Sequence, residues 1–223
     1  MKQFILAIYL FTVASGVFAQ KEALKSLCAD YEQRFVKNTT FQLSYTLTVA
    51  SSLDTTKESM KFDLYKSGDK DCAKIGDSQV MIHDGTFFLL VNHEVHTIRI
   101  NNDSSNLNSK NMLVSSFTSI IDSSSNIQYQ TKDNKIYYTV LFPSSYVYSK
   151  IEFVFSKKTK SLIYIYALFS ETYPSEFKFI EVDYSEPDFK WKPAADFPGT
   201  GKYIQKTNGR YVIQEAFDSY KTY

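Results

Sequence analysis

The histidines of this chain have the residue types for metal chemistry but not the spacing. There are three, His83, His93 and His96. His93-Glu94-Val95-His96 is not His-Glu-x-x-His, and it falls in a predicted hairpin turn, where a zinc ion would lack a rigid support. His83 stands directly before a predicted turn, so it is expected to flank that turn rather than act as a base. We therefore predict no metal site and no cofactor.

Nucleophilic side chains are present without a catalytic setting. Serines are numerous, but no Gly-x-Ser-x-Gly elbow occurs, and seven glycines form no phosphate-binding loop. Cys28 falls on an apolar helical face and Cys72 beside a strand, and neither has a histidine nearby in the sequence. We predict no catalytic residue and a protein that is not an enzyme. A hydrolase built from scattered Ser, His and Asp residues is the least favoured alternative.

The two cysteines leave two structural alternatives open. If the protein is exported, Cys28 and Cys72 could form a disulfide. They could equally remain two buried thiols, because a free cysteine behaves as a small apolar side chain.

The N-terminus has the pattern of a secretory signal peptide. Lys2 supplies the positive charge, residues 4–13 are almost wholly apolar, and Val17 and Ala19 fit the −3 and −1 positions of a cleavage site. The apolar run is shorter than the roughly 20 residues that span a bilayer. The prediction is a signal peptide over 1–19 and a single mature domain over 20–223, with no transmembrane segment.

Charge argues against a nucleic-acid partner. The whole chain has 25 Lys and Arg against 24 Asp and Glu, and Lys2 is the only charged residue of the predicted signal peptide. The mature chain is therefore neutral, whereas nucleic-acid binders usually have a basic excess or stripe.

Hydrophobic periodicity predicts two helices and a series of antiparallel strands. An amphipathic helix has Leu24, Leu27, Cys28, Tyr31 and Phe35 on one face, and a short helix is expected over 112–121. Between and after them, period-two or apolar runs bounded by turn residues indicate strands. The expected strands are 41–49, 60–64, 72–75, 80–82, 87–91, 97–100, 127–130, 136–142, 150–155, 162–169 and 177–184. Residues 101–111 are expected to form a loop, and 185–223 an irregular tail with a short strand at 211–213.

Two of these strands are apolar on both faces, which constrains the architecture. Residues 162–169 have no polar face, and 137–142 have only Thr139 as an exception. Such strands need cover on both sides, and two modest helices cover only one. A barrel, half-barrel or sandwich is therefore favoured over a flat sheet.

The aromatic content is the feature most suggestive of function. The chain has 18 phenylalanines and 17 tyrosines, distributed over the strands. They could simply fill the core, since aromatics favour strands. They could also line an apolar cavity between the curved sheet and the helices, able to take an acyl chain or a hydrophobic peptide. In one choice of strand register, the lining residues are Tyr45, Leu47, Phe62, Phe88, Leu90, Tyr138, Val140, Phe153 and Phe155.

The order of segments resembles the LolA/LolB-like lipoprotein-carrier superfamily of Gram-negative bacteria. The shared features are the exported chain, the amphipathic helix, the alternating strand at 41–49, the hairpin run at 80–91 and the turn at 92–100 into the next strand. The resemblance covers roughly residues 21–184. It implies a mostly β (α+β) fold, in which a curved antiparallel sheet forms an incomplete β-barrel covered by the two helices. It also implies a periplasmic location and a cavity for lipid or lipoprotein acyl chains.

The sequence thus favours an exported, non-enzymatic carrier for a hydrophobic ligand, such as a lipid or lipoprotein acyl group, in outer-membrane lipoprotein localisation or envelope biogenesis. The alternative is a structural module with a filled barrel that binds a protein partner of the cell envelope.

Overall fold

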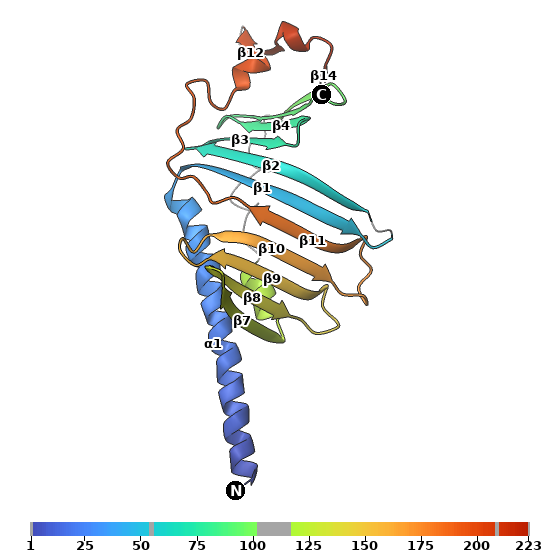
Figure 1. The fold of residues 1–223 in the computed structure, drawn as a ribbon. Coiled ribbons are helices and arrows are strands. Elements are labelled where there is room, and N and C mark those ends of the chain that lie inside the picture. Colours follow the sequence, from blue (N-terminus) through green and yellow to red (C-terminus); the bar gives the residue numbers. More distant parts are fainter. Residues whose placement is uncertain (1, 54–55, 102–116, 208–209, 223) are drawn as a thin grey trace. The chain divides into compact units, whose positions relative to one another are not determined.

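The computed structural model describes residues 2–53, 56–101, 117–207 and 210–222, with side chains from residue 18 onward. The fold is mostly antiparallel β, as the sequence predicts. Twelve strands follow one hydrogen-bonded order, β14-β6-β5-β4-β3-β2-β1-β11-β10-β9-β8-β7, and β12 pairs with β13 (Figure 1). The order has two free ends, so the sheet is open, in agreement with the expected incomplete barrel.

The chain divides into two compact units. The first is Met1–Arg34, Leu47–Ser59 and Lys110–Tyr184, and the second is Phe35–Thr46, Met60–Ser109 and Ser185–Tyr223. Strands β1 (Thr40–Ser51) and β2 (Lys57–Ser67) contribute residues to both. The single domain expected over 20–223 stays a prediction.

The first unit is an antiparallel meander with two helices on one face. Its strands are β7 (Asn126–Lys132), β8 (Lys135–Leu141), β9 (Tyr148–Ser156), β10 (Leu162–Phe169) and β11 (Phe177–Tyr184), and each pairs with the next. The register places Tyr138, Phe153 and Ile165 side by side on the buried face. These boundaries agree with the sequence prediction because the apolar runs end at polar turns.

Helix α1 (Lys2–Lys37) covers that face, as its periodicity predicts. Leu24, Cys28 and Tyr31 are buried at helical spacing. The second helix, α2 (Phe117–Asp122), lies behind β8 and β9 in Figure 1 and buries Ile121. The described part of this helix begins at Phe117, and Met112 and Leu113 of the prediction lie outside the described residues. Among the residues that the structure describes, no helix is long and apolar enough to cross a membrane.

The opposite face of this meander differs from the prediction. Cover on both faces was expected for 162–169, but Tyr164, Tyr166 and Leu168 are only half-buried. The Tyr164 hydroxyl donates a hydrogen bond to Glu181 at 2.9 Å, and the Lys150 amine lies 5.1 Å from the centre of the Tyr166 ring. A tyrosine presents an apolar ring and a polar hydroxyl, so this face tolerates partial exposure without a second sheet.

The second unit is a hairpin series closed by the C-terminal tail. Its further strands are β3 (Lys70–Ile75), β4 (Gln79–His83), β5 (Phe88–Asn92) and β6 (Thr97–Asn101), all antiparallel. The predicted Asp84-Gly85 hairpin is present, with Gly85 at φ +90°. The backbone angle favours glycine here, and a Cβ at this position would also lie 2.6 Å from an Asp69 carboxylate oxygen unless that exposed side chain moved.

The tail has more regular structure than the sequence predicts. Strands β12 (Ile204–Thr207) and β13 (Arg210–Ile213) form their own hairpin, and β14 (Lys221–Thr222) pairs with β6 in parallel. A short 3₁₀ helix, Thr200–Lys202, precedes β12, and a second, Glu215–Phe217, lies between β13 and β14. The segment 185–199 is irregular apart from an isolated bridge between Asp188 and Gln42. Tyr203 and Ile204 are buried against the sheet core of Cys72, Ile82, Leu89, Val91 and Ile98.

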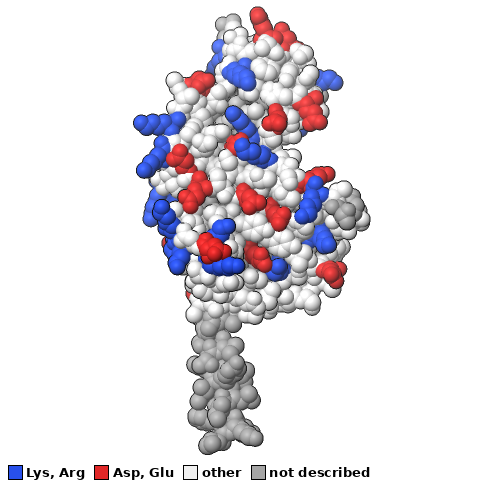
Figure 2. Space-filling view, viewed as in Figure 1, with Lys and Arg blue, Asp and Glu red and all other residues white. Residues whose placement is uncertain are grey.

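Charges of both signs are mixed over the surface. On the face of the described residues shown in Figure 2, Lys and Arg are interspersed with Asp and Glu. This agrees with a chain whose formal net charge is +1.

Candidate functional site

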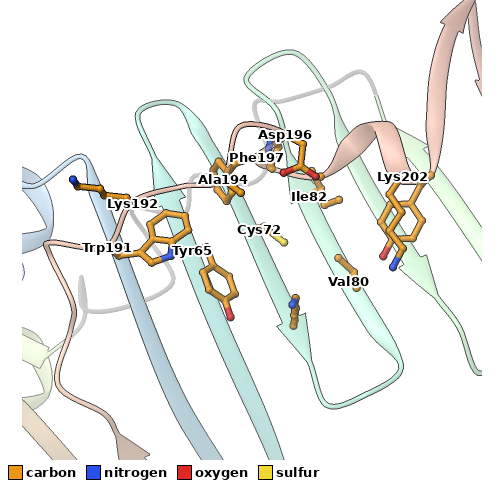
Figure 3. A pocket seen from close by; sticks show the side chains of 14 residues that line it. Tyr65, Cys72, Val80, Ile82, Trp191, Lys192, Ala194, Asp196, Phe197 and Lys202 are labelled. Carbon is orange, nitrogen blue, oxygen red and sulfur yellow. The ribbon is translucent and has the colours of Figure 1, made fainter.

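A groove of about 410 Å³ lies within the second unit, between the sheet and the tail (Figure 3). We call it the tail groove. Its floor consists of Tyr65, Cys72, Lys74, Val80 and Ile82 from β2, β3 and β4. Its wall comes from the tail residues Trp191, Lys192, Ala194, Asp196, Phe197, Pro198, Gly199, Lys202 and Tyr203. The volume lies within the range of small-molecule sites, roughly 300–1,000 Å³.

Strand pairing sets the floor. Tyr65 is opposite Cys72, and Cys72 is opposite Ile82, so their side chains point to one face of the sheet. Lys74 and Val80 form the next cross-strand pair on the same face. Cys72 and Ile82 are almost completely buried, whereas Tyr65 and Val80 are half-buried. The floor is therefore apolar, with one amine at its edge.

Aromatic contacts hold the wall. The Trp191 and Tyr65 ring centres are 5.5 Å apart, and those of Trp191 and Phe197 are 5.3 Å apart in an edge-to-face arrangement. A turn positions the next side chains, because the Phe197 amide donates to the Ala194 carbonyl at 3.1 Å. The tail thus presents an indole, a phenyl ring and an alanine methyl group to the groove.

The charged groups of the groove stand at its margin. The Lys74 amine lies 5.7 Å from the centre of the Tyr65 ring, and the Lys202 amine lies 5.2 Å from the centre of the Tyr203 ring. Lys192 and Asp196 are exposed. Three amines and one carboxylate therefore line an apolar interior.

The cysteines are buried thiols, which is one of the two alternatives that the sequence leaves open. Both are free in this structure. Burial raises the pKa of Cys28 to about 12 and that of Cys72 to about 11. A thiol with such a pKa is almost wholly protonated at neutral pH, so Cys72 contributes apolar surface to the groove rather than a nucleophile.

None of the three histidines lines the tail groove, although the centre of the His93 ring lies 5.9 Å from that of the lining residue Tyr203. His96 is exposed, as expected for a turn residue. His93 is half-buried, and its Nδ1 lies 2.8 Å from the Tyr220 hydroxyl. Burial lowers the pKa of His93, and the nearby Lys202 lowers it further. His83 Nδ1 lies 3.6 Å from the Asp71 carboxylate. Within the described ranges, no three His, Cys, Asp or Glu side chains are arranged to hold a metal ion.

The structure divides the sequence-predicted lining residues between the two units. Leu47, Tyr138, Val140, Phe153 and Phe155 belong to the first, where all but the half-buried Leu47 are buried. The other four, Tyr45, Phe62, Phe88 and Leu90, belong to the second and are half-buried. The cavity proposed for these nine residues stays a prediction.

None of those nine residues lines the tail groove. In β5, Phe88 and Leu90 alternate with the buried Leu89 and Val91, which point to the groove side of the sheet. The register chosen from the sequence therefore selects the face opposite to the tail groove. The missed signal is that both faces of β5 are apolar while the tail supplies unassigned aromatic residues, including Trp191.

Comparison with known proteins gives structural matches only. No protein-family model and no curated protein sequence matches this chain. Among solved structures, it is similar to a LolA superfamily protein from Nitrosomonas europaea, with 11% identity, a TM-score of 0.35, and coverage of 78% of this chain and 96% of that one. It is also similar to LprF from Mycobacterium bovis, with 8% identity, a TM-score of 0.44, and coverage of 76% and 93%. For the Mycobacterium tuberculosis lipoprotein LppX, the identity is 12%, the TM-score is 0.33, and the match covers 76% of this chain and 97% of that one. The LolA-like proteins that the sequence resembles are thus among the solved structures to which this fold is similar.

Proposed function

We propose that this protein is an exported binding protein that holds an apolar ligand, an acyl chain, in the tail groove. The observation that carries the proposal is the groove itself, about 410 Å³ and lined by Tyr65, Val80, Ile82, Trp191 and Phe197. Burial of each methylene of an acyl chain stabilises the complex by about 0.8 kcal/mol. A lipoprotein acyl group in the periplasm is one form of this ligand.

The chemistry of the groove supports binding rather than catalysis. Its thiol is protonated at neutral pH, because burial raises the pKa of Cys72 to about 11. Burial likewise raises the pKa of Tyr203, with smaller contributions from Cys72 and Tyr220. Neither group is suited to gain or lose a proton near neutral pH. The charged groups at the groove are exposed amines and one exposed carboxylate, which can orient a ligand.

Export is the second part of the proposal, and it rests on the N-terminal pattern. Lys2, the apolar run and Val17-x-Ala19 fit a signal peptide cleaved before Gln20. N-terminal sequencing of the protein from the periplasmic fraction of an expressing cell is expected to begin at Gln20 or within a few residues of it. A protein that keeps Met1, or that stays in the cytoplasm, would refute this part.

Ligand binding can be measured at the groove through Trp191. It is the chain's single tryptophan, and it lines the groove, so its fluorescence reports on this site alone. Palmitic acid brominated in the middle of its chain is expected to quench this emission in a saturable manner, because bromine quenches indole only at close contact. Native mass spectrometry of the purified protein should also show co-purified lipid.

The controls separate site binding from surface adsorption. Unbrominated palmitic acid should compete away the quenching, and free bromide should not reproduce its saturation. Absence of saturable quenching in delipidated protein would reject the acyl-chain proposal. The protein-partner alternative would then explain the fold better.

A further inference from the structure

The margin of the tail groove is more basic than an apolar-ligand site requires. Three of its lining residues are lysines, against the single carboxylate of Asp196. Among the ion pairs formed between described residues, none involves Lys74, Lys192 or Lys202. Their amines are therefore available to a ligand.

One amine lies at the Tyr65 end of the groove, away from the carboxylate. Lys74 and Trp191 both approach the Tyr65 ring, at 5.7 and 5.5 Å. Lys192 follows Trp191 in the chain, and in Figure 3 its exposed side chain extends outward from the rim, with Lys202 on the other side of the groove. Asp196 lies nearer to Phe197 and Ile82. The Tyr65 end thus has the Lys74 amine beside the ring and Lys192 at its rim, and the one lining carboxylate lies away from it.

One more acidic group faces Lys74 and has to be considered. Asp63 is the cross-strand neighbour of Lys74. Its carboxylate accepts a hydrogen bond from the Ser44 hydroxyl and lies 3.2 Å from the Lys61 amine. Since Ser44 and Lys61 already engage Asp63, that carboxylate neutralises Lys74 only in part.

An apolar interior with cations at one end matches a single-chain amphiphile with an anionic head. We infer that the tail groove selects a fatty acid, with the alkyl chain along Val80 and Ile82 and the carboxylate at the Tyr65 end, beside Lys74 and below the rim where Lys192 stands. This inference rests on the proposed function and adds the identity of the headgroup. A carboxylate accepts charge-assisted hydrogen bonds from ammonium groups, whereas an alcohol gains only neutral ones.

The test compares three ligands of equal chain length below their micelle concentrations: dodecanoate, dodecanol and dodecyltrimethylammonium. Titration calorimetry or Trp191 emission gives each Kd. Dodecanoate is expected to bind most tightly and the ammonium compound most weakly. Since each exposed ion pair contributes modestly, the Lys74→Gln/Lys192→Gln variant should bind dodecanoate roughly three- to tenfold more weakly, with dodecanol unaffected. Higher ionic strength should weaken only dodecanoate binding.

Lys70→Gln/Lys190→Gln is the matched control. Lys70 lies on the same strand as Lys74, and Lys190 two residues before Lys192; both are exposed, and neither lines the groove. The control also removes two positive charges, but from positions outside the groove, so it should keep the Kd for dodecanoate. Equal effects of both pairs, or equal binding of dodecanoate and dodecanol, would overturn the headgroup inference while leaving the proposed function intact. Failure of all three ligands to bind would reject the proposed function itself.

Discussion

Replacing Phe153 by alanine is expected to lower the free energy of unfolding by about 3–5 kcal/mol, the usual range for a fully buried phenylalanine. Phe153 has no exposed surface and lies in the middle of β9. Its ring contacts Phe117 of α2 edge-to-face, with 5.3 Å between the ring centres, and its strand neighbours are Tyr138 and Ile165. The substitution removes a ring that joins α2 to the sheet and leaves a cavity. Since domains are commonly stable by only 5–15 kcal/mol, the loss is large.

Urea unfolding followed by circular dichroism measures this loss, and Phe177→Ala is its matched control. Phe177 belongs to the same unit, but it is 41% exposed and stands at the start of β11. Its removal is expected to cost about 1 kcal/mol or less. Similar urea midpoints for the two variants would mean that Phe153 is not part of the packed core of this unit.

The sequence predicts the individual helices and strands of this protein better than it predicts which of them lie next to one another. The strands of the first unit follow from apolar runs such as 162–169, because each run ends at a polar turn with few alternatives. Helix α1 follows from the spacing of Leu24, Cys28 and Tyr31, all of which are buried. The Asp84-Gly85 hairpin follows from the glycine at position 85, whose φ of +90° is an angle that other residues rarely adopt. These signals are local, so a single sequence contains them.

The tail groove depends on contacts between distant parts of the chain, and local patterns do not determine these. Tyr65 and Trp191 are more than a hundred residues apart, yet their rings form one end of the groove. In β5, the side chains on both faces of the strand are apolar, so the alternation of polar and apolar residues cannot decide which face the tail covers. The same ambiguity led to the choice of Phe88 and Leu90 as lining residues, on the face opposite to the groove. In the tail, the predicted strand at 211–213 is present as β13, but its partner β12 was missed, because it is only four residues long.

The decisive test of the groove is to fill it. Ala194 lies on the exposed tail and lines the groove, so Ala194→Phe places a ring where the alkyl chain is proposed to lie. Phenylalanine keeps Trp191 as the single indole and preserves the fluorescence readout. If the ring displaces about three methylenes, the loss is about 2.4 kcal/mol, or roughly a fiftyfold rise in the Kd for dodecanoate. Ala195→Phe is the control, because Ala195 is equally exposed and does not line the groove. It should bind dodecanoate as the unchanged protein does.

A ring at position 194 could rotate into solvent, so Val80→Phe provides a second variant. Its side chain comes from the floor, where the strand fixes its direction toward the groove. Unchanged affinity in both filled variants, with unfolding midpoints showing that both are folded, would place the ligand elsewhere in the protein.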